Sequence, residues 1–147
     1  MSEFVPVVPQ AVEHREGVPA YTKAEFAEKK SRYCLLIPVI NEGERILAEL
    51  DRATAAGVTR LCDVALCDGG STDGSMDQAG LARRGVNTLL VKTGPGKQGA
   101  QLRMGIAWAL ERGYEGVLTI DGNNKDSIES VPLFLAKLKE GYDLIQG

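Results

Sequence analysis

The sequence lacks the features that mark membrane-spanning, secreted and nucleic-acid-binding proteins. No apolar run in its 147 residues approaches the roughly 18 residues of a membrane span, so we expect none in this chain. The first ten residues have neither a basic segment nor a long apolar segment, so we expect no secretory signal. The net charge is -3 and the lysines and arginines are scattered, so the basic excess expected of a nucleic-acid-binding protein is not visible. Hydrophobic residues make up 44%, which excludes a disordered tail.

Cysteine is also scarce. The three cysteines, Cys34, Cys62 and Cys67, are odd in number and show no C-x-x-C spacing, which argues against a disulfide framework and against a zinc site. Each lies in an apolar stretch, so we predict three buried free thiols and a reducing, cytoplasmic location. A reactive thiol at Cys67, beside Asp68, is the alternative.

The first 32 residues differ in composition from the rest. Of the 17 glycines, only Gly17 precedes Gly43. Residues 4–20 contain three prolines and predict an extended arm, and Thr22-x-x-Glu25 predicts a capping box that opens a short helix through Lys30. We therefore divide the chain into an N-terminal arm, 1–32, and a main domain, 33–147.

The main domain alternates apolar strands with amphipathic helices. We predict strands at 33–39, 62–67, 86–92, 116–120 and 142–146, and helices at 44–56, 75–84, 97–112 and 127–140. A capping box, Asn41-x-x-Glu44, opens the first helix, and a glycine follows each helix. In the third helix Leu102, Ile106, Ala109 and Leu110 predict the buried side. This alternation indicates an α/β fold, a mostly parallel sheet with helices on both faces. Because the chain stops after the fifth strand, we expect a C-terminally truncated domain.

Polar residues follow the predicted strands, at the edge where open parallel sheets bind ligands. Asp68 ends the second strand and is followed by two glycines. It caps nothing obvious, so we predict that its carboxylate accepts hydrogen bonds from a nucleobase or a ribose. For Asp73, further along this loop, a turn role is the better interpretation.

The fourth strand ends in a second acidic residue. Asp121 follows the strand directly and Asn123 lies two residues further on. Two oxygen-bearing side chains at this spacing predict a site for Mg²⁺ or Mn²⁺ that carries a diphosphate. Asp126-x-x-Glu129 predicts a cap for the fourth helix.

A glycine motif after the third strand supports a different function. Gly94, Gly96 and Gly99 form a G-x-G-x-x-G that follows a strand and opens a helix, the pattern of dinucleotide-binding enzymes. The alternative is therefore an NAD(P)- or flavin-dependent oxidoreductase. The motif follows the third strand rather than the first, and it leaves residues 68–73 without a role.

Four segments in order resemble the family 2 glycosyltransferases, inverting enzymes of the GT-A fold that include dolichyl-phosphate sugar synthases. The segments are 37–42 (IPVINE), 68–73 (DGGSTD), 96–100 (GKQGA) and 121–123 (DGN), and the resemblance covers residues 33–147. It implies a Rossmann-like nucleotide-binding half. It also implies transfer of a sugar from a UDP- or GDP-type donor to an acceptor hydroxyl, with inversion.

The resemblance assigns roles to single residues. Pro38, Asn41 and Glu42 would hold the nucleoside, Asp68 would accept from the base, and Lys97 would lie near the nucleotide. Asp121 would occupy the first position of the family's D-x-D motif, near the ribose and a divalent cation. Asn123 stands at the second position, where the family usually has a metal-binding Asp, and Gly69 stands where it commonly has a second Asp. A non-catalytic nucleotide-binding module is therefore a further alternative. The resemblance places the general base after the end of this chain.

Overall fold

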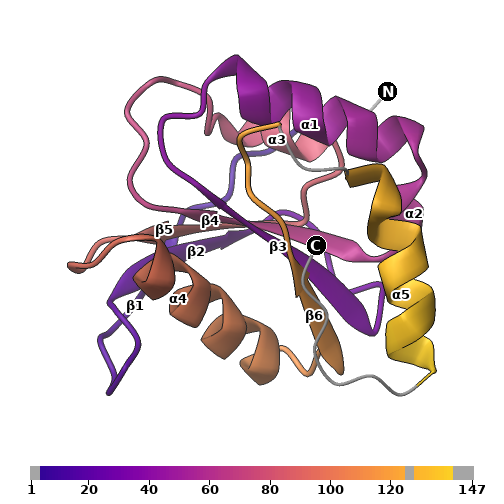
Figure 1. The fold of residues 1–147 in the computed structure, drawn as a ribbon. Helices are drawn as coiled ribbons and strands as arrows, with labels where there is room; N and C mark the ends of the chain where they lie inside the picture. Colours follow the sequence, from indigo (N-terminus) through magenta and orange to yellow (C-terminus); the bar gives the residue numbers. More distant parts are fainter. Residues whose placement is uncertain (1–3, 125–127, 141–147) are drawn as a thin grey trace.

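The computed structural model describes residues 4–124 and 128–140 and contains one six-stranded sheet (Figure 1). The strands are β1 (Gln10–Val12), β2 (Tyr21–Glu25), β3 (Tyr33–Val39), β4 (Asp63–Asp68), β5 (Thr88–Lys92) and β6 (Gly116–Thr119). Their order is β1-β2-β5-β4-β3-β6, and β5, β4, β3 and β6 run parallel. The fold class is therefore the predicted one, a mostly parallel α/β sheet.

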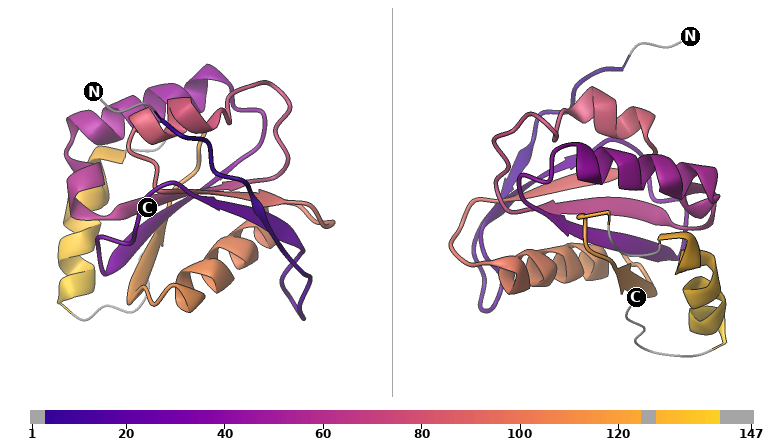
Figure 2. Two further views of the ribbon diagram at one scale, coloured as in Figure 1. Left: turned by 180° about the vertical axis from the view of Figure 1, so that it is seen from behind. Right: turned by 45° about the horizontal axis from the view of Figure 1, so that its top comes forward.

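Helices cover both faces of this sheet. They are α1 (Glu44–Ala55), α2 (Val58–Leu61), α3 (Gln78–Arg83), α4 (Gln98–Glu111), the short 3₁₀ helix η1 (Ile128–Ser130) and α5 (Val131–Lys139). One apolar core joins the sheet to α1, α2, α3 and α5, and a second joins it to α4 on the other face (Figures 1 and 2). Every residue of β3 is buried, as the unbroken apolar run YCLLIPV predicts.

The helix predicted for residues 22–30 is wrong, because residues 22–25 belong to strand β2 and 26–30 form neither helix nor strand. Tyr21 and Ala24 are buried, and β2 pairs antiparallel with β5. The unpaired edge of β5 offers the backbone of this segment more hydrogen bonds than a short isolated helix would. The arm therefore extends the sheet.

Two other local predictions also need correction. Asn41 does not cap α1, since the N-cap is Gly43 and the Asn41 backbone has a φ of 47°. The helix predicted for 75–84 begins only at Gln78, because Asp77 is its N-cap and accepts a hydrogen bond from the Gly80 N–H. The cap predicted at Asp126, the helix stop at Gly141 and the strand predicted at 142–146 lie outside the described residues.

Helix α4 buries a different side from the predicted one. Of the predicted stripe only Ala109 is buried, whereas Ile106 and Leu110 are 39% and 70% exposed. The buried side instead carries Met104 and Trp108. At Gly105 a Cβ would lie 2.5 Å from Cys67 Sγ, so the absence of a side chain lets α4 approach β4 closely.

The three cysteines are buried free thiols, as predicted. Burial raises the pKa of the Cys67 thiol to about 12, which leaves it protonated and unreactive at neutral pH. Within the described ranges, no helix is both long and apolar enough to cross a membrane.

Candidate functional site

A cavity of about 150 Å³ opens at the carboxyl ends of β3 and β6. The chain runs from β3 through β4 to β5 in one direction across the sheet and then returns to place β6 on the other side of β3. Such a reversal of strand order is where open α/β sheets bind ligands. The cavity is lined by Pro38, Val39, Ile40, Glu42, Gln98, Gln101, Asp121, Gly122 and Asn123.

The cavity brings together four of the residues singled out from the sequence. Pro38 and Glu42 come from the end of β3, and Asp121 and Asn123 come from the loop after β6. The other three predicted site residues, Asn41, Asp68 and Lys97, are not part of its lining.

Sequence reasoning missed Gln98 and Gln101, which reach the cavity from the first turn of α4. Gln98 Nε2 donates to Asp121 Oδ1 at 2.7 Å, so α4 orients the carboxylate. The three-residue spacing of the two glutamines puts both on one side of the helix, and this was the available signal. Because the cavity meets the start of α4, the positive end of the helix dipole lies beside it.

Gln101 fixes the floor of the cavity. Its side chain is buried, and Nε2 donates to two backbone carbonyls, Val39 O at 2.8 Å and Cys67 O at 2.9 Å. A Cβ on Gly69 would lie 3.1 Å from the Gln101 amide, so Gly69 packs directly against it. This one amide therefore links the carboxyl ends of β3 and β4.

The loop after β6 packs against β3 at Gly122. Its N–H donates to Pro38 O at 3.3 Å, and a Cβ at this position would overlap the Val39 side chain. Only a residue without a side chain fits this close approach, which places Asp121 and Asn123 on either side of it at the cavity.

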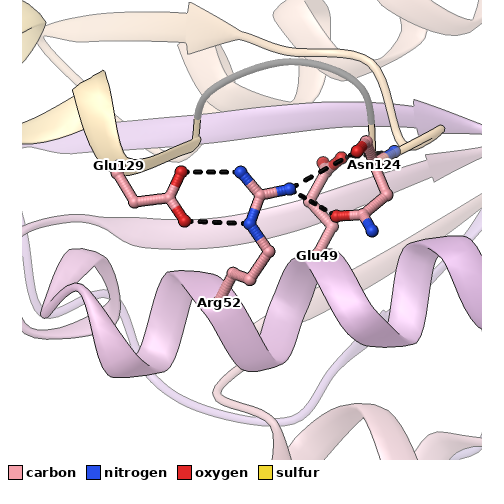
Figure 3. Close-up of polar contacts among 4 residues, drawn as sticks. All are labelled: Glu49, Arg52, Asn124 and Glu129. Carbon is pink, nitrogen blue, oxygen red and sulfur yellow. Dashed lines mark hydrogen bonds and ion pairs between the residues drawn. The ribbon is translucent and has the colours of Figure 1, made fainter.

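Polar contacts from α1 hold the far end of this loop (Figure 3). Arg52 makes a bidentate ion pair with Glu129 of η1, at 2.8 and 2.6 Å, and its Nη1 donates to Asn124 Oδ1 at 2.5 Å. The buried Glu49 accepts from the Asn124 N–H at 2.8 Å. Asn124 has a φ of 62°, and these contacts fix the loop in this left-handed turn.

Asp68 has a local structural role that the sequence did not reveal. Its carboxylate accepts from the Ser71 N–H at 3.1 and 3.0 Å and from Ser71 Oγ at 2.5 Å, so it closes the turn after β4. The expectation that it caps nothing is wrong. Burial raises the pKa of this carboxyl above its usual value, and the hydrogen bonds from Ser71 partly offset that effect.

The loops after β3 and β4 are joined to each other. The Asn41 N–H donates to Ser71 Oγ at 2.9 Å, and Asn41 Oδ1 accepts from the Thr72 N–H at 2.8 Å. Asp73 accepts from the Gly43 N–H at 2.9 Å and from Ser75, which confirms its turn role.

The charged groups of the cavity are both acidic. Glu42 and Asp121 line it, and no lysine or arginine does so among the residues that the structure describes. Glu42 Oε2 lies 3.1 Å from Arg45 Nε in an ion pair, without a hydrogen bond of good geometry. The cavity therefore suits hydroxyl and N–H donors or a cation.

The donor set near Asp121 cannot enclose a metal ion alone. In residues 4–124 and 128–140, no cluster of three His, Cys, Asp or Glu side chains could hold one. Asp121 and Asn123 supply hard oxygen donors, and Mg²⁺ often takes only one or two protein ligands beside phosphate oxygens and water. The residues fit a metal that a phosphate ligand helps to hold.

Two of the three glycines in the motif after β5 have a local structural reason. A Cβ on Gly94 would lie 3.1 Å from the Ala20 nitrogen, and Gly96 has a φ of 120°. Neither glycine lines the cavity, and β4 separates β5 from β3 in the sheet. Lys97, the N-cap residue of α4, is exposed.

The chain is similar to curated sugar transferases. It is 28% identical over 120 residues to undecaprenyl-phosphate 4-deoxy-4-formamido-L-arabinose transferase of Serratia proteamaculans, and 26% identical to the Yersinia pestis protein of that name. Each match covers 80% of this chain and 37% of the relative, so the chain spans just over a third of their length. No family model and no solved structure matches.

Proposed function

We propose that this chain is the donor-binding part of a glycosyltransferase that takes a sugar from a nucleoside diphosphate, with inversion. The proposal rests on one observation: Glu42 and Asp121 both line the cavity at the point where the strand order reverses. The similarity to curated sugar transferases supports this class of activity.

The two carboxylates have separate tasks in this proposal. Glu42 and Pro38 contact the nucleoside, and Asp121, oriented by Gln98, accepts a hydrogen bond from the ribose. A volume of about 150 Å³ holds one part of a nucleotide, since whole-ligand pockets usually exceed about 300 Å³. Contacts of Asn41, Asp68 and Lys97 with the donor, from outside this cavity, remain predictions.

The diphosphate needs positive charge that the cavity walls do not supply. We assign Asp121 and Asn123 as the protein ligands of a Mg²⁺ or Mn²⁺ ion, which when bound would neutralise the leaving diphosphate. The start of α4 contributes further positive potential.

The relatives suggest the class of acceptor. Their name specifies undecaprenyl phosphate, so we propose a lipid phosphate rather than the hydroxyl that the family resemblance implies. A phosphate oxygen would form the new bond to the anomeric carbon as the bond from that carbon to the diphosphate breaks. A phosphate monoester is largely deprotonated at neutral pH, with a second pKa of about 6, so this attack does not require a strong general base.

Calorimetric titration of the chain with UDP and GDP, each with Mn²⁺, tests donor binding. We expect one nucleotide to bind and Asp121→Asn to weaken it at least about tenfold, the loss expected for a contact to a charged group. Asp51→Asn is the matched control, because Asp51 is exposed and pairs only with Arg84 in the described structure.

The titration also distinguishes the alternatives. If neither nucleotide binds a folded sample, the proposal is wrong. Tight NADH binding that Gly96→Val abolishes would support the oxidoreductase instead. Donor binding without transfer, in a protein of the relatives' full length, would support a non-catalytic module.

A further inference from the structure

A second cavity, of about 280 Å³, lies at the opposite end of the sheet from the candidate site. It is formed where β3 and β4 begin, beside α2 and the end of α5. Its lining residues are Lys30, Ser31, Arg32, Tyr33, Arg60, Leu61 and Lys139. The function proposed above gives this cavity no role.

Of the seven described residues that line it, four are cationic and none is acidic. Of these, Arg32 makes a bidentate contact with Glu115, at 2.7 and 3.2 Å. Lys30, Arg60 and Lys139 have no ion pair with any described carboxylate. The whole chain has a net charge of -3, so the positive charge around this cavity is opposite in sign to the charge of the chain.

The described acidic groups nearby form no ion pair with Lys30, Arg60 or Lys139. Glu115 is used by Arg32. The buried Asp63 accepts from the Lys30 and Ser31 N–H groups and from the Tyr114 hydroxyl at 2.6 Å. Glu140, next to Lys139 in the chain, is exposed and outside the lining.

We propose that this basic cavity binds a phosphate-bearing ligand. Lys30, Arg60 and Lys139, which pair with no carboxylate in the described part of the chain, repel one another around this cavity, and a bound anion relieves that repulsion. Lysine and arginine together suit phosphate, because the guanidinium matches phosphate oxygens in pairs and the ammonium adds a point charge. A monocarboxylate carries a single charge, which is fewer than these three cations.

The walls indicate that the ligand has a small organic part as well. Leu61 is 42% exposed and Tyr33 contributes to the lining, so an apolar surface lies beside the cations. The volume suits a phosphorylated small molecule or the headgroup of an anionic lipid. These two sources share the phosphate chemistry and are separated by experiment.

The first arm is calorimetric titration with inorganic pyrophosphate at low ionic strength, with EDTA present so that no metal-dependent site contributes. We expect binding that weakens with added salt. Arg60→Gln/Lys139→Gln should weaken it at least tenfold, and both side chains are exposed, so the fold should persist. The matched control is Lys23→Gln/Arg83→Gln, which removes the same charge away from the cavity and should leave binding unchanged.

The second arm is co-sedimentation with phosphatidylglycerol vesicles against phosphatidylcholine vesicles, using the same variants. Binding of phosphatidylglycerol vesicles alone, lost in Arg60→Gln/Lys139→Gln, identifies a lipid headgroup, whereas binding of pyrophosphate alone identifies a soluble ligand. The proposal is overturned if wild type binds neither probe, or if the two double variants lose binding equally. Asp121→Asn should leave both arms unchanged, so this result is independent of the donor-site test.

Discussion

At the scale of single residues, the pKa values of Asp68 and Asp73, which lie in one loop, are shifted in opposite directions. Burial raises the pKa of the Asp68 carboxyl, whereas hydrogen bonds from Ser75 and Gly43 lower that of Asp73. A raised folded-state pKa favours folding at low pH, and this contribution is lost as the pH rises through it. A folded-state pKa below the ordinary value favours folding at pH values above the ordinary pKa. This stabilisation is lost as the pH falls through the folded-state pKa.

We therefore expect opposite pH profiles for Asp68→Asn and Asp73→Asn. Between about pH 3 and pH 6, the unfolding free energy of wild type minus that of Asp68→Asn should fall as the pH rises. The unfolding free energy of wild type minus that of Asp73→Asn should rise over the same range. Urea unfolding at several pH values measures both. Profiles that change in the same direction would contradict the environments described for the two carboxyls.

Gly122 is the residue whose replacement should damage the site most directly. Gly122→Ala places a methyl group against Val39, so we expect a loss of about 1–3 kcal/mol in unfolding free energy, typical of overpacking, and weaker nucleotide binding. Gly99→Ala is the control, because only the flexible end of Arg103 lies near that position, at 3.4 Å. Chemical denaturation of both variants measures the difference, and equal losses would exclude a special role for Gly122.

Strand-end chemistry made part of the site predictable from the sequence. Glu42, Asp121 and Asn123 follow strands, and the carboxyl ends of parallel strands meet at one edge. Gln98 and Gln101 could not be found in this way, because their contribution depends on how close α4 lies to β3 and β4. The role of Asp68 was missed because its hydrogen bond with Ser71 depends on the conformation of the turn, which the sequence did not specify.

At the scale of elements, continuous apolar runs predicted the central strands well, because both faces of those strands are covered. The segment 22–30 was misassigned because a local capping pattern cannot register the open edge of β5, which is formed by a distant part of the chain. The buried side of α4 was predicted wrongly because the helix is apolar on more than one side. Periodicity alone does not indicate which of these sides packs against the sheet.

The contact between α1 and the loop after β6 is an element-scale feature that can be tested. Arg52→Gln should lower the melting temperature and weaken nucleotide binding several-fold, because the loop bearing Asp121 loses its tie to α1 and η1. Arg15→Gln breaks an exposed ion pair with Glu111, and neither residue lines the candidate site or the basic cavity, so this variant should leave nucleotide binding unchanged. Calorimetry on both variants checks this, and equal binding by Arg52→Gln and wild type would refute the positioning role.

At the scale of the whole molecule, the arm completes the sheet rather than hanging from it. β2 covers the edge of β5 along its full length, and β1 covers β2 (Figure 2). Tyr21 of β2 is buried in the core beside α4. The predicted boundary at residue 32 therefore separates two segments of one sheet.

Removal of residues 1–32 should accordingly make the protein associate. The deletion exposes the edge of β5 and the apolar surface under Tyr21, and unpaired edges promote strand pairing between molecules. Removal of residues 1–9 is the control, because it takes away the backbone contacts of Val7 with Gln78 and leaves β1 and β2 intact. Size-exclusion chromatography should show oligomers for the longer deletion only; a stable monomer of 33–147 would mean that the arm is dispensable.

The Asn41 N–H donates to Ser71 and the Thr72 N–H donates to the Asn41 side chain, so the segments after β3 and β4 are held together. A ligand that contacts Glu42 and orders the segment after β3 should therefore also order the segment after β4, although the latter does not line the cavity. In NMR relaxation measurements, the amides of Asn41 and Thr72 should then sharpen together, at the same concentration of added nucleotide.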